Sequence, residues 1–181
     1  MLELSLHIID IVENSVRAEA DKINICIEEE IKRDFLTIKI KDNGNGMDRN
    51  LLKQALDPFT TTKENKKVGL GLSLLKEAAV RCGGDLMITS SPESGTELKA
   101  DFIRSHIDRQ PIGDIIETLI VLVTGYPQVD FFFSHRIDDK SIEWDTSRIH
   151  EQCGDIMRSN PKVINFIKND LRKMYNNFKQ Y

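Results

Sequence analysis

The chain has little that would assign it to a specialised class of protein. Its 181 residues contain three cysteines, Cys26, Cys82 and Cys153, which lie far apart and form no CxxC pair. An odd number of scattered cysteines gives no disulfide framework, and this usage is typical of a reducing compartment. We therefore expect a cytoplasmic protein whose stability comes from its hydrophobic core.

Long apolar runs are absent as well. The most apolar stretch, residues 115–123, contains Glu117 and is too short to cross a bilayer. The first four residues lack the charged and apolar layout of a signal peptide. These two absences predict a protein without a membrane-spanning segment or a membrane partner.

Positive charge is not concentrated along the chain as a whole. The formal net charge is −4 and no long basic run occurs, whereas dedicated nucleic-acid binders usually carry a basic patch or stripe. We expect no nucleic-acid partner. Residues 158–181 are locally basic, which indicates a solvated helix face or, alternatively, a docking face for an acidic protein partner.

What the chain does have is a clear alternation of strand and helix patterns. Residues 3–19 place apolar side chains at helical spacing, whereas residues 22–28 and 36–42 alternate apolar and polar side chains as strands do. Further strands are predicted at 85–91, 96–103, 129–134 and 141–146, and further helices at 51–56, 70–82, 112–123, 149–157 and from Asn160 onward. A change of composition at 105–111 divides the chain into a unit of residues 1–104 and a small α+β extension of residues 105–181.

Four short motifs follow one another in the first unit. They are HIIDIVENS at 7–15, DNGNGM at 42–47, VGLGL at 68–72 and SGT at 94–96. Together they supply an oxygen ligand for a metal ion, an acceptor for an adenine amine, backbone amides for phosphates and a second adenine contact. These are the groups that binding of Mg-ATP requires.

Asp42 is the candidate that would contact adenine. It has the same parity as the apolar residues of strand 36–42, so its carboxylate should point to the buried face. A buried carboxylate needs a donor, and the exocyclic amine of adenine is one. Gly44 and Gly46 would let the backbone approach a flat ligand, and Met47 would give it an apolar contact. A plain Asp-Asn-Gly turn is the alternative.

Asn14 and Asp10 share one face of the first predicted helix, one turn apart. Mg²⁺ takes oxygen ligands and leaves positions for phosphates and water, so the amide oxygen of Asn14 is a sufficient protein ligand. Asp10 would then lie near the terminal phosphate, where it could orient or deprotonate an attacking water. A solvated Asn14, and an Asp10 that complements the helix dipole, are the alternatives.

The candidates for phosphate and further adenine contacts lie in three short segments. Free amides at a helix N-terminus attract anions, and hydroxyl and ammonium groups upstream would add to that site. These residues are Gly69, Leu70, Gly71 and Leu72 at the helix start, Thr61, Thr62 and Lys63 before it, and Thr96 as the second adenine contact. Ordinary loop and strand residues are the alternative for each segment, and no Walker motif is present.

In this order the motifs resemble those of the Bergerat-fold (GHKL) ATPases, which include gyrase B, heat-shock chaperone ATPases, mismatch-repair ATPases and sensor histidine kinases. Asn14 matches the magnesium asparagine and Asp42 the adenine-binding aspartate of that superfamily. Residues 57–63 look like the phenylalanine box of the histidine kinases, and residues 68–74 look like their second glycine box. The resemblance covers residues 1–103.

This resemblance implies an α+β fold, a two-layer α/β sandwich in which a mixed sheet carries helices on one face. ATP and Mg²⁺ would bind between the sheet, the helices and a mobile lid of about residues 47–68. One position departs from the family's ATPases, which have glutamate where this chain has Asp10. The shorter side chain keeps the charge but reaches less far toward a catalytic water.

Three functions are compatible with these residues. The first is slow ATP hydrolysis as a conformational switch, with Asp10 as the base. The second is a protein kinase that acts in trans on a partner protein, similar to the stand-alone anti-sigma-factor kinases, for which a water-activating base is unnecessary. The third is an ATP-sensing interaction module without turnover. The extension is expected to contact a protein partner, and a homodimer is left open.

Overall fold

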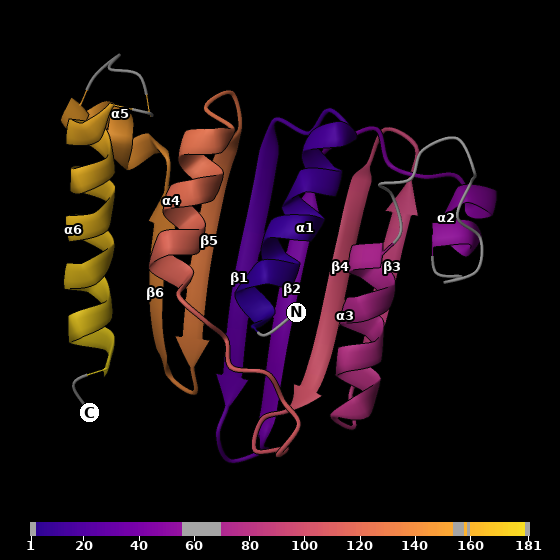
Figure 1. The fold of residues 1–181 in the computed structure, drawn as a ribbon. Helices are drawn as coiled ribbons and strands as arrows, with labels where there is room; N and C mark the ends of the chain where they lie inside the picture. The colour runs from indigo at the N-terminus through magenta and orange to yellow at the C-terminus, as the bar shows by residue number, and fades with distance from the viewer. Residues whose placement is uncertain (1–2, 56–69, 154–157, 159, 180–181) are drawn as a thin grey trace.

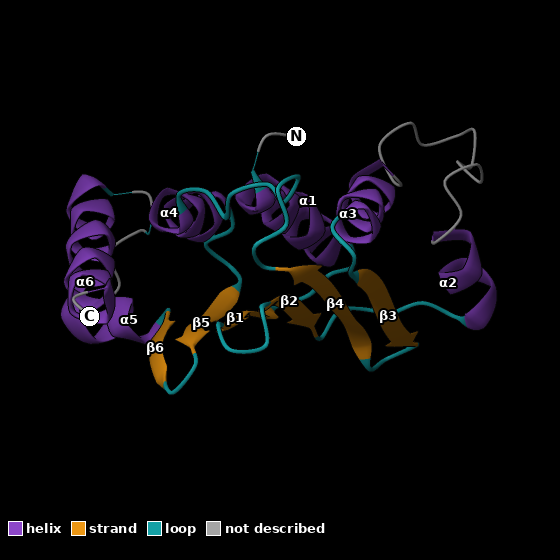
Figure 2. Ribbon diagram, turned by 90° about the horizontal axis from the view of Figure 1, so that it is seen from below, coloured by secondary structure: helices purple, strands orange, loops and turns teal. Residues whose placement is uncertain are grey.

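The computed structural model describes residues 3–55, 70–153, 158 and 160–179. In these residues helices cover one face of a sheet and leave its other face bare, with α2 beyond the β3 edge (Figures 1 and 2). The helices are α1 (Leu4–Arg17), α2 (Arg49–Ala55), α3 (Leu70–Arg81), α4 (Ile115–Gly125), α5 (Ser147–Cys153) and α6 (Pro161–Lys179). The strands are β1 (Lys22–Glu30), β2 (Phe35–Asp42), β3 (Asp85–Ser91), β4 (Gly95–Ile103), β5 (Asp130–Ile137) and β6 (Lys140–Asp145).

The described strands form one six-stranded mixed sheet in the order β3-β4-β2-β1-β5-β6. Neighbours pair antiparallel throughout except for β1 and β5, which run parallel from Lys22↔Asp130 to Glu29↔Ile137. The α+β fold class, a mixed sheet with helices on one face, is therefore confirmed. The predicted strands and helices are found with small shifts at their ends.

The start of α4 is the clearest of these shifts. Its helical pattern predicts a helix from residue 112, but α4 begins at Ile115 because Asp114 caps it: the Asp114 side chain accepts a hydrogen bond from the backbone N–H of Glu117. Ile112 is held outside the helix, since its carbonyl oxygen accepts from the N–H of Ser5, 2.8 Å away.

The extension continues the sheet of the first unit. β5 and β6 add to the free side of β1, and α4 lies beside α1 in the same helical layer (Figure 1). The buried side chains of Phe131, Phe133 and Trp144 belong to the same hydrophobic core as Leu4 and Ile25. The predicted boundary at residue 104 therefore falls inside one sheet and one core.

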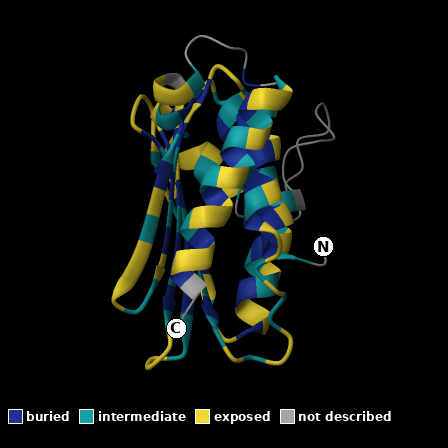
Figure 3. Ribbon diagram, turned by 90° about the vertical axis from the view of Figure 1, so that its left-hand side faces the viewer, coloured by how far each residue is buried: buried dark blue, intermediate teal, exposed yellow. Residues whose placement is uncertain are grey.

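The two faces of the sheet differ as the alternation in the strands predicts. Residues that face the helices are buried, whereas the helices turn their exposed residues outward (Figure 3). The open face carries ion pairs between strands, such as Lys39 with Glu28 and Lys41 with Glu97. These charged cross-strand pairs keep the uncovered face polar. In the described part of the chain, no helix has the length and apolar character needed to cross a membrane.

Candidate functional site

Asp42, the last residue of β2, lies buried against α1, as its parity predicts. Only 7% of its surface is exposed. Its Oδ2 accepts a hydrogen bond from Ser15 Oγ at 2.6 Å, and its Oδ1 accepts from the N–H groups of Gly44 and Thr96, each at 3.0 Å. These contacts satisfy the buried carboxylate and fix its orientation. They also bring Thr96, at the start of the neighbouring strand β4, against Asp42.

Gly44 and Gly46 hold the loop after β2 against neighbouring backbone. A Cβ on Gly44 would lie 2.6 Å from the carbonyl oxygen of Ala18, at the end of α1. Gly46 has a φ of +65°, and a Cβ there would lie 2.0 Å from the carbonyl oxygen of Ser91. These close contacts are with the protein's own backbone, and the approach of the two glycines to a ligand stays a prediction.

Met47 and Thr96 are joined through a serine. The N–H of Met47 donates to Ser90 Oγ at 2.8 Å, and Ser90 Oγ lies 2.9 Å from Thr96 Oγ1. The loop that carries Met47 is thus fastened to the β3–β4 hairpin beside Asp42. Ser90 gave no signal in the sequence, because a serine near the end of a strand is unremarkable.

Ser15 is the other polar residue of this site that sequence reasoning did not select. It lies in the apolar stripe of α1 and is 4% exposed. Its position in that stripe was the available signal, since a hydroxyl at a buried helix position needs a partner. The structure supplies that partner as Asp42 Oδ2.

Asp10 and Asn14 lie half-buried on α1, at the side that meets α3. A Cβ on Gly71 would lie 3.0 Å from Asp10 Cβ and 3.1 Å from its Oδ2, so Asp10 contacts the first turn of α3 directly. Burial raises the pKa of Asp10 above its ordinary value, and the nearby carboxylate of Glu13 raises it further. Asn14 Oδ1 accepts a hydrogen bond from Arg17 Nη1 at 3.3 Å.

The phosphate-binding candidates are only partly described. Leu70, Gly71 and Leu72 form the first turn of α3, as predicted. Leu72 is partly buried against the core, and Gly71 lies against Asp10. Thr61, Thr62, Lys63 and Gly69 lie outside the described residues, as does most of the predicted lid; α2 occupies the described beginning of that segment.

The arrangement therefore gathers part of the predicted set at one end of the sheet. Asp42, Gly44 and Thr96 share hydrogen bonds, and Met47 is joined to them through Ser90. Asp10 meets the start of α3 on the neighbouring side of α1. The carboxylate of Asp42 can accept a hydrogen bond from an amine of a ligand. The free amides at the start of α3 can bind an anion.

Comparison with known proteins extends this picture. Residues 2–106 match the model of a family described as histidine kinase-, DNA gyrase B-, and HSP90-like ATPase. The chain is 31% identical over 103 residues to a putative sensor protein of Shewanella frigidimarina, covering 56% of this chain and 16% of that protein. It is 34% identical over 89 residues to sporulation kinase E of Bacillus subtilis, covering 49% of this chain and 12% of the kinase. The chain thus spans a small part of the length of these relatives.

A solved structure described as the N-terminal domain of a DNA repair protein has a similar fold. The TM-score is 0.59 at 18% sequence identity, and the match covers 91% of this chain and 57% of that one. At that coverage the likeness extends well into residues 105–181. The extension is therefore part of a recurring arrangement of strands and helices, whatever its role in this chain.

Proposed function

Because the chain belongs to the family of histidine kinase-, DNA gyrase B- and HSP90-like ATPases, we propose that it binds Mg-ATP between α1, the start of α3 and the loop after β2, and that it hydrolyses ATP slowly as a conformational switch. Family membership implies ATP binding. The metal ion, the lid, the individual ligands and the turnover are the proposed part.

The hydrogen bonding of Asp42 carries this proposal. A carboxylate offers about four acceptor positions, and in the described part of the chain Ser15, Gly44 and Thr96 fill three of them. The open position belongs to Oδ2, which has one described donor. The exocyclic amine of adenine is a donor of the right kind, and it would meet a carboxylate that is already oriented.

Asn14 and Asp10 would act on the phosphate side. The amide oxygen of Asn14 would exchange Arg17 for Mg²⁺, which prefers hard oxygen ligands. The raised pKa of Asp10 makes its carboxylate a better proton acceptor than an ordinary aspartate. Its contact with the first turn of α3 puts it beside the amides that would hold phosphate.

The remaining nucleotide contacts are proposed from where the residues lie in the fold or in the sequence. Leu70, Gly71 and Leu72 would offer amides from the first turn of α3, and Met47 would contribute an apolar contact beside Gly44 and Gly46. Gly69, Thr61, Thr62 and Lys63 retain their proposed phosphate contacts from the sequence, and the lid of about residues 47–68 would close over the nucleotide.

Transfer of the phosphate to a partner protein is the second candidate. The similarity to sporulation kinase E favours it, and so does the short reach of Asp10, because a kinase does not need to activate water. An ATP-sensing module without turnover is the third candidate. In the second and third, the extension would meet the protein partner, and the cytoplasmic location expected from the sequence remains part of the proposal.

One labelling experiment separates these candidates. The chain is incubated with Mg²⁺ and ATP labelled on its terminal phosphate, alongside Asp10→Asn, Asn14→Ala and a control, Asp139→Asn, which changes an exposed aspartate in the β5–β6 turn. Free phosphate from the parent and the control, but not from Asp10→Asn, supports hydrolysis with Asp10 as base. Bound, unturned ATP that is lost in Asn14→Ala contradicts autonomous hydrolysis and favours transfer or sensing. Failure of the parent to bind ATP contradicts the whole proposal.

A further inference from the structure

A cavity of about 570 Å³ lies at the end of the sheet opposite Asp42. Asp42 pairs with Ile23 at the beginning of β1, whereas the cavity is lined by Glu29 near the end of that strand. The ends of β1 and β5, the beginning of α4 and the second half of α6 enclose it. Its volume lies in the range of small-molecule sites, and none of its lining residues belongs to the candidate nucleotide site.

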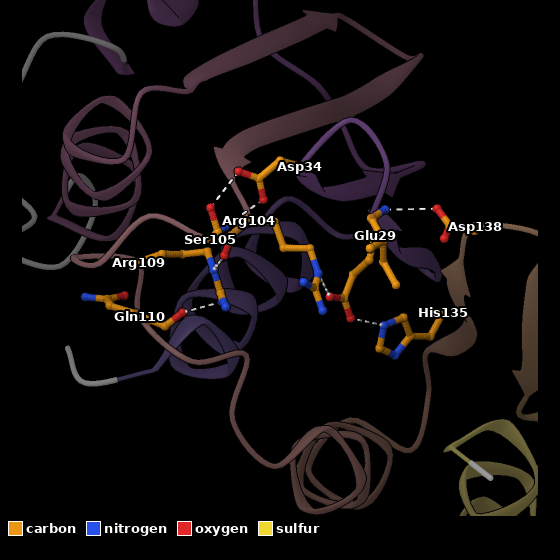
Figure 4. A network of polar contacts seen from close by, with 9 residues as sticks. Glu29, Asp34, Arg104, Ser105, Arg109, Gln110, His135 and Asp138 are labelled. Atoms are coloured by element: carbon orange, nitrogen blue, oxygen red, sulfur yellow. Dashed lines mark hydrogen bonds and ion pairs between the residues drawn. The ribbon is translucent and has the colours of Figure 1, made fainter. Parts of the chain in front are cut away.

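The inner end of the cavity is polar and already satisfied. Glu29 Oε2 accepts a hydrogen bond from Arg104 Nε at 2.6 Å, and Glu29 Oε1 lies 3.2 Å from His135 Nε2 (Figure 4). His135 Nδ1 lies 3.1 Å from the hydroxyl of Tyr175. Hydrogen bonding from His135 lowers the pKa of Glu29 to about 2, so this carboxylate is ionised at neutral pH. These hydrogen-bonded side chains form a polar floor of the cavity, whose orientation is fixed before a ligand binds.

The rim differs from the floor, because it carries two opposite charges that are not paired. Arg172 of α6 and Asp114 at the start of α4 both line the cavity and both are exposed. Neither forms an ion pair with any residue that the structure describes. One helical turn away, Lys168 of α6 does pair with Glu117 of α4 at 2.5 Å. The same two helices thus form one ion pair outside the cavity, whereas the opposite charges of Arg172 and Asp114 at its rim are not joined in an ion pair.

The walls between rim and floor are apolar. They are formed by the isoleucine side chains Ile112, Ile115, Ile116 and Ile137. A site of this kind, apolar walls with a few placed charged groups, is typical of pockets for small organic molecules. The two rim charges favour a ligand that carries one negative and one positive group. The isoleucines favour an apolar group between them.

We propose that this cavity binds a small zwitterion with an apolar side chain, of the class of the aliphatic α-amino acids. The ligand's carboxylate would pair with the guanidinium of Arg172, which suits a bidentate contact, and its ammonium would pair with Asp114. The aliphatic side chain would lie among the isoleucines. The proposal does not depend on nucleotide binding, since it rests on residues at the other end of the sheet.

The wall of the cavity is connected to the first helix by backbone hydrogen bonds. The N–H groups of Leu4 and Ser5 donate to the carbonyl oxygens of Pro111 and Ile112, at 2.9 and 2.8 Å. The residues that a ligand would contact are thus continuous with the beginning of α1. Binding of a ligand should therefore change the amide chemical shifts of Leu4, Ser5 and residues 112–116.

The test uses L-leucine as the probe and the full chain as the protein. Binding is followed by amide chemical shifts and by calorimetry, in parallel with isopentylamine, which lacks the carboxylate, and 4-methylpentanoate, which lacks the ammonium. We expect a Kd on the order of 1 mM for L-leucine. We expect binding at least about tenfold weaker for each analogue, since each leaves one charge of the rim unpaired. The largest shifts should fall on residues 113–116.

Three variants complete the test. Arg172→Gln and Asp114→Asn each remove one rim charge, and asparagine preserves the cap of α4. Lys173→Gln is the matched control, because Lys173 is the exposed neighbour of Arg172 on α6 and does not line the cavity. We expect each rim variant to weaken L-leucine binding at least about tenfold while the control binds as the parent does. No binding at about 10 mM ligand, equal binding by the rim variants, or equal binding of the singly charged analogues would each overturn the proposal.

Discussion

At the scale of single residues, the candidate site depends on hydroxyl groups as much as on charged groups. Ser15 connects α1 to Asp42, and Ser90 connects the loop after β2 to Thr96. The burial of Asp42 could be predicted from parity, because a strand alternates its faces regularly. Ser15 was marked only by its place in the apolar stripe of α1, and Ser90 by no local pattern, since a hydroxyl has no characteristic spacing and its partner lies in another element.

Substitution of Ser15 tests whether Asp42 is held ready for a ligand. Ser15→Ala removes the donor to Asp42 Oδ2 and leaves a buried acceptor with less hydrogen bonding, which typically costs about 1–3 kcal/mol. We expect lower stability in urea denaturation, together with weaker ATP binding by calorimetry because the carboxylate is less well oriented. Ser134→Ala, on the open face of the sheet, is a control that should change neither. Normal ATP affinity in a destabilised Ser15→Ala protein would show that Asp42 does not depend on this contact.

Glu29 gives a prediction about pH. Its folded pKa of about 2 lies below the value near 4.3 of an unfolded glutamate. A lowered folded pKa contributes stability that is complete above the unfolded value and is lost as the pH falls from there through the folded one. We therefore expect Glu29→Gln to destabilise the protein at pH 7, measured by urea denaturation, and the difference from the parent to shrink as the pH falls from about 4 toward 2.

The control for this prediction lies next in the strand. Glu30→Gln removes a partly exposed carboxylate whose partner is the exposed Arg33 at 3.1 Å, and ion pairs at the surface contribute little. We expect it to leave the unfolding free energy nearly unchanged at both ends of the pH range. A difference between parent and Glu29→Gln that is the same at pH 7 and at low pH would mean that packing, and not the ionised carboxylate, explains the loss.

At the scale of elements, the loop after β2 is held in place by its glycines. Gly46 has a positive φ and its Cα faces the backbone of Ser91, so Gly46→Ala introduces both backbone strain and a clash. We expect a loss of stability of more than about 1 kcal/mol and weaker ATP binding, because the same loop carries Met47 and positions the N–H of Gly44.

Gly125→Ala is the matched control for this loop. A Cβ on Gly125, at the end of α4, would meet nothing within 4 Å, so we expect thermal unfolding close to that of the parent. A Gly46→Ala protein that melts with the parent and binds ATP equally well would mean that the loop after β2 adjusts freely, contrary to the contacts described above.

The elements themselves could be predicted far better than their pairing. The alternation in residues 22–28 and the helical stripe in residues 3–19 follow from local geometry, and β1 and α1 are found there. The β5–β6 hairpin was predicted as a pair, but its parallel junction with β1 joins Lys22 to Asp130. No local pattern specifies a partner so distant in the sequence, because that choice depends on which strands together bury the apolar face in the folded chain.

At the scale of the whole molecule, the parallel pairing of β1 with β5 bears on whether residues 1–104 can fold alone. Without the extension, β1 becomes an exposed edge strand, and α1 loses α4 as its neighbour in the helical layer. Core side chains next to Phe131 and Phe133 would meet water, at roughly 25 cal/mol for each Å² of apolar surface. An exposed edge beside an uncovered core also favours association between chains.

We therefore expect a chain that ends after residue 104 to lose cooperative thermal unfolding and to aggregate, measured by circular dichroism and size-exclusion chromatography against the full chain. Restoring residues 105–181 as a separate polypeptide should recover part of the cooperative transition, because β5 could then pair with β1. If the fragment alone unfolded cooperatively as a monomer at a melting temperature close to that of the full chain, the predicted boundary at residue 104 would be a true folding boundary. The shared sheet would then be a docking of two independent units, and the cavity between β1, β5, α4 and α6 would form only when they meet.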